Sequence, residues 1–343
     1  MPESNLPFLP LLQKLIREEP FCAEDAEAAM RLILSGSVSP VQLSAFLVLL
    51  PPRKVGADVL LGLARAMRAE MVPVNPGLGP VLDTCGTGGD GANTFNISTV
   101  AAFVVAGAGV KVAKHGNRSA SSLCGSADVL EALGVNIDLS AEQMGASIQE
   151  TGIAFLFAPK LHPALRHAGP VRSELKVRTV FNLMGPLCNP AAAQAQLVGV
   201  PSEGIGDEMA WTLAQLGGGR QYLVHGSDGL DEITLSGSTI VWRVENGNYQ
   251  KEFWQPSDFG LPRASLESLR GGDRFANAAI TREILSGAAG PKRDIVVMNA
   301  AAGLLVAGAA TDLAAAVQAA RASIDSGAAL GKLEAMAAFS QRP

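Results

Sequence analysis

A short apolar strand runs directly into a glycine-rich turn in the stretch VLDTCGTGGDG, residues 81–91. Glycine readily adopts positive φ angles, so such a turn can point several backbone N–H groups at one place and hold an anion. Polar residues follow from Asn93 to Thr99, where the helix predicted over 97–107 begins. Hydroxyl and amide groups at a helix N-terminus suit a phosphate or a hydrated metal ion. The simpler alternative is a tight turn followed by an ordinary helix cap.

Strand-like and helical segments alternate after this stretch. The apolar runs predict strands over 81–85, 110–113, 154–157, 197–200 and 222–224, and the helical patterns between them cover 97–107, 121–134 and 141–151. A hairpin is predicted over 233–244, turning at Gly237-Ser238, and Ala-rich helix is predicted for about the last 70 residues. This alternation favours an α/β domain with a mostly parallel central sheet.

The N-terminal segment carries helical patterns and no strand pattern. A helix is predicted over about 23–34, a second one begins after the capping residue Ser39 with Pro40 in its first turn, and a further one covers about 55–70. Pro51-Pro52 ends the second of these helices. Short helices bury little surface alone, so this segment should pack on the rest of the chain or on a second copy. We therefore predict a helical domain over 1–75 and an α/β domain over 76–343.

Composition restricts the class of protein. Of the 343 residues 48% are hydrophobic and 17% charged, so the chain can bury a sizeable core. The net charge is −5, whereas proteins that bind nucleic acid usually carry excess positive charge, so DNA or RNA is not expected as the main partner. A local basic groove could still hold an anion. The four cysteines form no C-x-x-C pair, which argues against a disulfide framework or a zinc site.

We expect neither a signal peptide nor a membrane-spanning helix. The first residues lack the basic and apolar regions of a signal peptide. The most apolar stretch, 295–310, contains Asn299 and is predicted as a buried helix rather than a membrane span. We expect a soluble, cytoplasmic protein that binds neither membrane nor nucleic acid.

A second polar cluster, KHGNRSASS at 114–122, follows the strand predicted over 110–113. Ligands of open α/β sheets gather at the carboxyl ends of strands. A lysine, an arginine, a histidine, an amide and several hydroxyls within nine positions suit a phosphate ester that carries a polar sugar. The alternative is a solvated basic loop.

Two further stretches carry candidate residues. The carboxylates of DGLDE at 228–232 are either solvent-facing turn residues or ligands of Mg²⁺, which proteins hold through one or two carboxylates. The stretch 159–182 contains His162, His167, Arg172 and Arg178. Arg172 is suited to pair with a carboxylate, and the alternative is an ordinary helical surface. The chain has no G-x-S-x-G motif, so a catalytic triad is not indicated.

These motifs together resemble the anthranilate phosphoribosyltransferase family. The resemblance covers essentially the whole chain and rests on GTGGD at 86–90, NIST at 96–99, KHGNRSASS at 114–122, NLMGPLCNP at 182–190, DGLDE at 228–232 and GPKRD at 290–294. It implies transfer of the phosphoribosyl group of phosphoribosyl pyrophosphate (PRPP) to the amine of anthranilate, with pyrophosphate released, in tryptophan biosynthesis. It also implies a nucleoside-phosphorylase-like fold, about two Mg²⁺ ions per subunit, and a homodimer formed by the helical domain with helices from about 165–190.

The resemblance also implies roles for individual residues. The PRPP site would comprise Gly86, Gly89, Asp90, Thr94, Asn96, Ile97, Ser98, Thr99, Lys114, His115, Gly116, Asn117, Arg118, Ser119, Ala120, Ser121, Ser122 and Ser126. Mg²⁺ would be held by Ser98, Asp231 and Glu232. Anthranilate would contact Gly86, Asn117 and Arg172, with His115, Pro159, His162 and Arg178 along its path. Arg172, Asn117 and His115 are the implied catalytic residues.

The chain departs from the family pattern at three places: Leu123-Cys124 replaces a more polar pair, Lys176 replaces a common glycine, and Pro51-Pro52 interrupts a helix connection. Two alternative functions stay open. One is a phosphate-dependent pyrimidine nucleoside phosphorylase on the same fold, and the other is a non-catalytic relative that binds nucleic acid. Contact with an anthranilate synthase subunit is not indicated either way.

Overall fold

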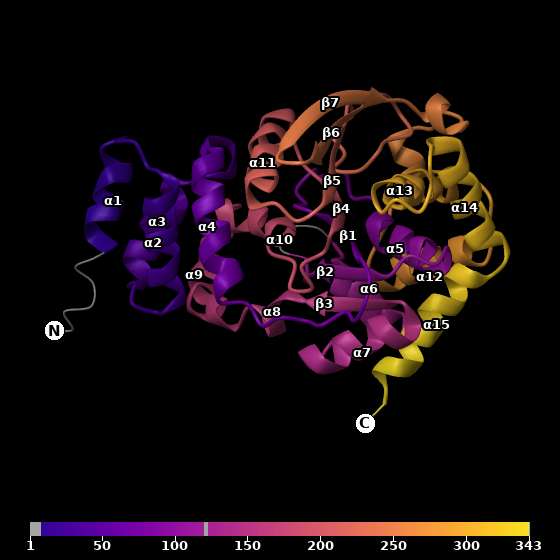
Figure 1. The fold of residues 1–343 in the computed structure, drawn as a ribbon, viewed down its shortest axis with the longest axis horizontal. Coiled ribbons are helices and arrows are strands. Elements are labelled where there is room, and N and C mark those ends of the chain that lie inside the picture. The colour runs from indigo at the N-terminus through magenta and orange to yellow at the C-terminus, as the bar shows by residue number, and fades with distance from the viewer. Residues whose placement is uncertain (1–7, 120–122, 343) are drawn as a thin grey trace.

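The computed structural model describes residues 8–119 and 123–342. N-terminal helices lie at one end of an elongated molecule, and a sheet with its covering helices forms the rest (Figure 1). The strands are β1 Leu82–Gly86, β2 Val112–Gly116, β3 Ile153–Phe157, β4 Ala195–Gly199, β5 Arg220–Gly226, β6 Thr239–Glu245 and β7 Asn248–Trp254. The helices are α1 Phe8–Ile16, α2 Ala23–Leu34, α3 Pro40–Leu49, α4 Ala57–Ala69, α5 Ile97–Gly107, α6 Ser126–Ala132, α7 Ala141–Thr151, α8 Ala158–Leu161, α9 Gly169–Leu175, α10 Met184–Leu187, α11 Glu203–Leu216, α12 Arg274–Leu285, α13 Pro291–Val306, α14 Leu313–Asp325 and α15 Ala328–Ser340.

Within the described residues, seven strands form one sheet in the order β3-β2-β1-β4-β5-β6-β7. Strands β1 to β5 run parallel, and β6 and β7 add an antiparallel edge. The predicted α/β architecture with a mostly parallel sheet is therefore confirmed.

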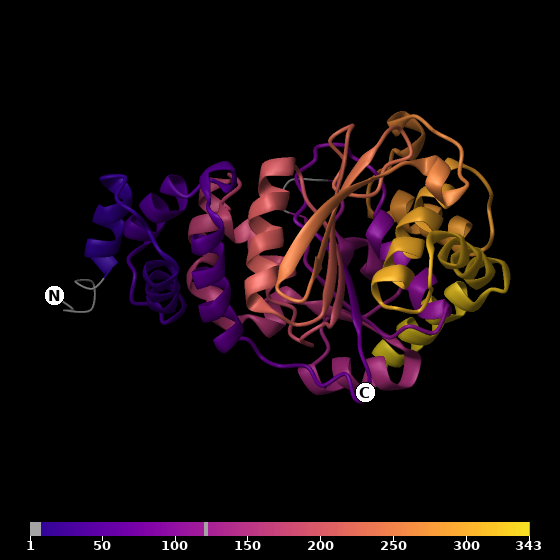
Figure 2. The same cartoon turned by 45° about the horizontal axis from the view of Figure 1, so that its top comes forward.

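The sheet separates two apolar cores. Neighbouring residues of a strand point to opposite faces, and in β4 Leu197 belongs to one core and Val198 to the other. Helices α5 and α13 pack against the first face, with α14 and α15 outside them. Helix α11 covers the second face and lies between the sheet and α4 (Figure 2). Burial on both faces is typical of parallel strands, and it is most complete in β3, IAFLF, where every residue is buried and apolar.

Several predicted elements are confirmed at residue level. The helices α2, α5 and α7 have the predicted bounds, and the helix predicted over 55–70 is α4. The Ser39 hydroxyl accepts a hydrogen bond from the Gln42 N–H at 3.3 Å, as predicted for a capping residue. The apolar stretch 295–310 forms most of the buried helix α13. In the part of the chain that the structure describes, every helix is too short or too polar to cross a bilayer.

The predicted hairpin over 233–244 is wrong. The observed hairpin joins β6 to β7 and turns at Asn246-Gly247, while 233–238 lie outside the strands. The hydroxyls of Thr234 and Ser236 donate hydrogen bonds to Asp228, so local side-chain bonds replace strand pairing there. Strand β7 was not predicted because its sequence, NYQKEFW, is polar on an exposed edge.

The predicted bounds of two other elements need correction. Strand β2 extends to Gly116, so Lys114 and His115 lie inside the strand and not after it. The helix predicted over 121–134 is shorter, because α6 begins at Ser126. Of its predicted first residues, 121 and 122 lie outside the described part of the chain.

Close packing of α2 on α4 depends on Gly62. A Cβ atom at this position would lie 2.0 Å from the carbonyl oxygen of Ala23 and 2.8 Å from the Cβ of Ala26. The nearest of these atoms is backbone, so it cannot rotate away, and the two helices would have to separate.

We predict that Gly62→Ala lowers the free energy of unfolding, because overpacking costs about 1–3 kcal/mol and outweighs a helix-propensity gain of at most about 1 kcal/mol. Gly204→Ala in α11 is the matched control, since a Cβ there meets no atom within 4 Å. This control should unfold at the same or a higher urea concentration than the unmodified chain. Equal shifts of both variants in urea unfolding would contradict the packing argument.

Candidate active site

The strand order of the sheet reverses between β1 and β4, and the region at the carboxyl ends of these two strands is called the crevice below. After β1 the chain builds β2 and β3 on one side and then returns to place β4 on the other. Open α/β sheets bind ligands where the strand order reverses in this way. The last residues of the two strands, Gly86 and Gly199, are paired, and the Thr87 N–H donates to the Gly199 carbonyl at 3.0 Å.

The glycine-rich turn 86–91 follows β1 into this crevice. Gly88, Gly89 and Gly91 have positive φ angles of 64°, 91° and 70°. The side chain of Arg178 lies directly on the turn, because a Cβ at Gly89 would be 1.5 Å from its Nη1 atom. Its Nη2 atom donates to the Thr87 carbonyl at 3.1 Å. The structure therefore places Arg178 on the turn that begins at Gly86, and its expected place along the path of anthranilate stays a prediction.

The DGLDE segment, which follows β5, closes the same crevice. The Gly88 N–H donates to Oδ2 of Asp231 at 3.0 Å, and the Ser98 N–H donates to Oε1 of Glu232 at 3.1 Å. A Cβ at Gly199 would lie 1.7 Å from the Asp231 carbonyl oxygen. Glycine at the end of β4 thus lets this segment approach the sheet. The predicted residues 86–90, 98 and 231–232 do come together.

Burial and like charges make this carboxylate pair unfavourable when ionised. The pKa of Asp231 is raised by burial and then by the nearby carboxylates Asp90 and Glu232. Burial likewise raises the pKa of Glu232 to about 7, although Lys114 and the Ser98 N–H act in the opposite direction. Lys114 is itself buried, which lowers the pKa of its ammonium group. Within the described residues, no group of three or more His, Cys, Asp or Glu side chains is arranged to hold a metal ion. A metal at this pair would need further ligands from other groups.

The first turn of α5 supplies polar groups to the crevice, but some of them are already engaged. The Asn96 side chain donates to the Cys124 carbonyl at 3.1 Å and accepts from the Asn277 amide at 3.0 Å. Ile97 and Thr99 are buried, and the Thr99 hydroxyl has no hydrogen-bond partner among the described residues. Thr94 forms an isolated bridge with Arg270 beside this turn.

The cations of the KHGNR segment are bound within the chain. The Lys114 ammonium group donates to the Thr84 carbonyl and, at 3.4 Å, to the Ser98 hydroxyl. The Arg118 guanidinium is bound by Asp128 at 2.9 Å and by Glu131 at 2.6 Å. These two side chains would have to exchange partners before they could hold a ligand.

The remaining residues of this predicted cluster form a compact turn. The Asn117 carbonyl accepts from the Ala127 N–H at 3.2 Å and from the Ser126 hydroxyl at 3.2 Å, and the Ser119 N–H donates to Asp128 at 3.3 Å. Gly116 leaves room for Ser126, whose hydroxyl would be 2.4 Å from a Cβ there. The predicted residues Ala120, Ser121 and Ser122 lie outside the described part of the chain.

Two buried histidines meet next to this strand end. The ring centroids of His115 and His162 are 5.1 Å apart. The Nδ1 atom of His115 lies 3.0 Å from the Gly185 carbonyl, which can only accept, so Nδ1 carries the proton and Nε2 carries a lone pair. This Nε2 and both ring nitrogens of His162 are buried without a partner among the described residues. Burial lowers both pKa values, that of His162 to about 3.

Arg172 lies in α9 with its guanidinium 5.5 Å from the centre of the Phe181 ring. Burial lowers its pKa, and no carboxylate among the described residues offsets this effect. A guanidinium in this position is suited to a carboxylate from outside the chain. Pro159 lies in α8 and is exposed.

The departures from the family pattern have local explanations. Lys176 ends α9 with φ 50°, a left-handed conformation that glycine adopts at lower cost. Cys124 is buried and binds Asn96 through its backbone carbonyl, while the Leu123 side chain is 74% exposed. Pro52 begins a 3-10 turn between α3 and α4.

Sequence analysis gave no role to Asp83 and Asn189. Asp83 is fully buried in β1, where its carboxylate accepts from the His115 N–H at 3.0 Å and from the Asn189 amide at 2.8 Å. The same amide donates to the Ala113 carbonyl at 2.9 Å. A charged residue inside an apolar strand was the signal that could have identified Asp83.

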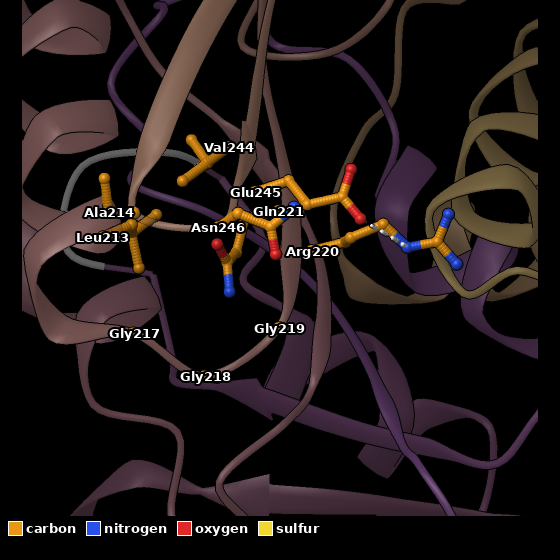
Figure 3. A pocket seen from close by; sticks show the side chains of 11 residues that line it. Leu213, Ala214, Gly217, Gly218, Gly219, Arg220, Gln221, Val244, Glu245 and Asn246 are labelled. Atoms are coloured by element: carbon orange, nitrogen blue, oxygen red, sulfur yellow. Dashed lines mark ion pairs between the residues drawn. The ribbon is translucent and has the colours of Figure 1, made fainter.

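A separate cavity of about 310 Å³ lies at the opposite end of the sheet (Figure 3). It is formed by the end of α11, the glycines 217–219 before β5 and the β6–β7 turn, with Arg220 and Glu245 3.9 Å apart at its side. None of the predicted site residues is among the described residues that line it. The crevice at β1 and β4 is therefore the better candidate for catalysis.

Comparison with known proteins agrees with this geometry. Residues 9–71 match the model of a glycosyl transferase family helical bundle domain, and residues 78–330 match that of a glycosyl transferase family a/b domain. The chain is 54% identical over 333 residues to anthranilate phosphoribosyltransferase of Solibacter usitatus, covering 96% of this chain and 98% of that protein.

Solved structures give the same result. Anthranilate phosphoribosyltransferase from Thermus thermophilus superposes with a TM-score of 0.90 at 45% identity, covering 97% of this chain and 99% of that one. The Saccharomyces cerevisiae enzyme in complex with PRPP and Mg superposes with a TM-score of 0.89 at 29% identity, covering 98% of both chains. The chain therefore belongs to the anthranilate phosphoribosyltransferase family.

Proposed function

We propose that this chain transfers the phosphoribosyl group of PRPP to the amine of anthranilate, the reaction that serves tryptophan biosynthesis in its family. The observation that supports this most directly is the meeting of the glycine-rich turn, the first turn of α5 and the Asp231-Glu232 pair at one strand crevice. Backbone N–H groups, hydroxyls and paired carboxylates there suit a diphosphorylated sugar bound with Mg²⁺.

PRPP would first meet the glycine-rich turn, which is exposed. The glycine-rich turn is exposed at Gly86, Gly88 and Gly89, and Arg178 lies on it. Lys114 and Arg118 remain part of the proposed site, but they act only after release from Thr84 and from Asp128 and Glu131. We expect PRPP binding to rearrange the segment that begins at Asn117.

The Asp231-Glu232 pair fits a divalent cation. Both side chains offer hard oxygen ligands. Asp231 accepts the Gly88 N–H and Glu232 accepts the Ser98 N–H, and a carboxylate has further lone pairs with which it can bind a cation. Burial is the main reason that both pKa values are raised, and neighbouring carboxylates add to it, so a bound cation would stabilise the ionised forms. Bound Mg²⁺ supplies electrostatic stabilisation of the negative charge on departing pyrophosphate. We propose about two ions per subunit, with Ser98 near one of them.

The transfer itself requires little chemistry from the protein. The amine nitrogen forms a bond to C1 of the ribose while the bond from C1 to the pyrophosphate oxygen breaks, and pyrophosphate leaves with the electron pair. The amine then loses one proton. An aromatic amine is already unprotonated at neutral pH, so orientation is the main requirement. We propose that Arg172 binds the anthranilate carboxylate and that Asn117 and the His115–His162 pair line the amine's path.

The helical part of the chain is the proposed dimer contact. Its helices expose apolar side chains in pairs seven residues apart: Leu9 and Ile16 on α1 are 41% and 59% exposed, and Val41 and Val48 on α3 are 81% and 58% exposed. Residues seven apart share a helix face. Ala168 and Val171 from the 165–190 segment are buried in the same core as α2 to α4. The proposed domain division at about residue 75 rests on the change from helices alone to alternating strands and helices after α4. We also propose a cytoplasmic location, because PRPP is highly charged.

The activity is tested by following the loss of anthranilate fluorescence. We expect loss only when PRPP and Mg²⁺ are both present, and omission of either should stop it. The same preparation should not cleave a pyrimidine nucleoside with inorganic phosphate. Nucleoside cleavage without anthranilate consumption would favour the phosphorylase alternative.

Arg172→Ala should raise KM for anthranilate about 30- to 1000-fold, because losing one charge-assisted contact costs about 2–4 kcal/mol. Arg166→Ala is the control, since Arg166 lies nearby in sequence and is exposed. Steady-state kinetics with each substrate varied in turn separates the effects. Unchanged anthranilate kinetics together with a collapse of PRPP binding would refute this assignment.

Asp231→Asn combined with Glu232→Gln should abolish Mg²⁺-dependent turnover without unfolding the chain. When folding raises the pKa of a carboxyl group, that group destabilises the folded state as the pH rises from its unfolded pKa to its folded pKa. For Glu232 this destabilisation begins at about pH 4.5 and is complete above about pH 7. The neutral amides remove this cost, and the metal-free variant should melt at or above the wild-type temperature at pH 8. Glu150→Gln, in an exposed ion pair on α7, is the control. Wild-type activity in the double variant would remove this pair from the mechanism.

A further inference from the structure

One polar side chain interrupts the apolar core helix α13. Asn299 is fully buried, and its neighbours from Ile295 to Leu304 along the helix are buried too. Burying an amide is costly unless its donors and acceptor are bonded. Residue 299 therefore needs an explanation beyond packing.

The Asn299 amide binds both backbone groups of one residue outside its own helix. Its Oδ1 atom accepts from the Ile233 N–H at 3.0 Å, and its Nδ2 atom donates to the Ile233 carbonyl at 3.1 Å. The second Nδ2 hydrogen goes to the Ile295 carbonyl, one turn earlier, at 2.9 Å. Both donors and the acceptor are thus used.

Ile233 directly follows the Asp231-Glu232 pair. It is buried with 1% exposure and lies outside the strands, so it has no neighbouring strand to bond its N–H and carbonyl groups. A buried backbone group left without a partner costs about 1–3 kcal/mol. Asn299 takes the place of that strand and fixes the backbone at the residue next to Glu232.

Helix α13, which carries Asn299, packs closely against α5, the helix whose first turn binds Glu232. In that turn Ser98 donates its N–H to Glu232. Gly303 allows this approach, because a Cβ there would be 3.1 Å from Val105 of α5 and 3.2 Å from Leu82 of β1. The backbone after Glu232 and the N–H that binds its carboxylate are therefore held by two helices in direct contact.

We propose that Asn299 is a positioning residue for the carboxylates of Asp231 and Glu232, and that it acts by clamping the backbone of Ile233. This inference rests on the proposed function, in which the pair holds Mg²⁺. A purely structural role would make Asn299 important for stability and for nothing else. The two roles differ in what happens to metal binding.

The test compares Asn299→Leu and Asn299→Asp with the control Ser323→Ala. Leucine has a similar volume but leaves both Ile233 groups unbonded, and aspartate keeps an acceptor but loses the donor to two carbonyls. Ser323 is also buried in the helical layer, and its hydroxyl donates to the Val104 carbonyl of α5 at 2.7 Å. Its loss removes one buried hydrogen bond at a distance in sequence from the DGLDE segment.

Three quantities are measured on the full chain: Mn²⁺ binding by electron paramagnetic resonance in the absence of turnover, the Mg²⁺ concentration for half-maximal turnover, and KM for anthranilate. Changes in groups that orient metal ligands cost about 10- to 100-fold in metal affinity. Both Asn299 variants should weaken Mn²⁺ binding and raise the Mg²⁺ requirement by about this factor, with KM for anthranilate within about twofold. Ser323→Ala should lower the melting temperature and leave all three quantities unchanged.

The inference is overturned when the Asn299 variants melt earlier, as the control does, but bind Mn²⁺ as the unmodified chain does. Asn299→Ser, which keeps a small polar group, provides a second variant in case leucine prevents folding. Asp231→Asn with Glu232→Gln separates the two levels of the proposal. Unaltered Mn²⁺ binding in that double variant rejects the metal pair itself, whereas altered binding there and unaltered binding at Asn299 rejects only the positioning role.

Discussion

The contact between β1 and β4 is the constraint on which the site depends. These strands are separated in sequence by β2 and β3, yet they pair along their full length from Leu82 and Ala195 to Gly86 and Gly199. Gly86 and Gly199, at the end of this pairing, leave space that a side chain would fill. The Asp231 carboxylate lies beside Gly86, and the Asp231 backbone carbonyl lies beside Gly199. The glycine-rich turn of β1 therefore meets the carboxylates after β5, although the segments are 143 residues apart at their hydrogen bond.

Buried polar side chains bond backbone groups that strand pairing leaves without a partner near the ends of β1 and β2. Strands β1 and β2 are paired at Leu82 and Val112, but further along Asp83 binds the His115 N–H and Lys114 binds the Thr84 carbonyl. Side chains thus replace part of the strand ladder next to the crevice, and the two strand ends are free to diverge there. Buried hydrogen bonds of this kind favour a single arrangement of the strand ends, because breaking them would leave buried polar groups unbonded.

Local sequence patterns predicted much of the fold, and their failures have physical causes. Helix α7 begins at the capping box of Ser140 and Gln143, and α5 is one apolar run, so local patterns were enough to predict the bounds of both. The wrong hairpin arose because 233–238 resembles a strand, while Asp228 and Asn299 supply the hydrogen bonds that would otherwise come from a neighbour. The motifs that form the site could be recognised individually, but the engagement of Lys114 and Arg118 with other groups depends on partners distant in the sequence, which no local pattern contains.

The charged side chains of the site are only partly paired with groups of opposite charge. Burial disfavours the ionised forms of Asp231 and Glu232, and it equally disfavours the cations of Arg172 and Arg178. Arg178 is partly offset by Asp231 and Asp90, whereas Arg172 has no such partner in the described part of the chain. A cation bound at the two carboxylates would offset the cost of burying their negative charge. An anion bound at Arg172 would likewise offset the cost of burying its positive charge. The buried charges at the two places have opposite signs and lie on different segments, so a single small ion cannot neutralise both. The arrangement therefore favours a cation at Asp231 and Glu232 and a separate anion at Arg172.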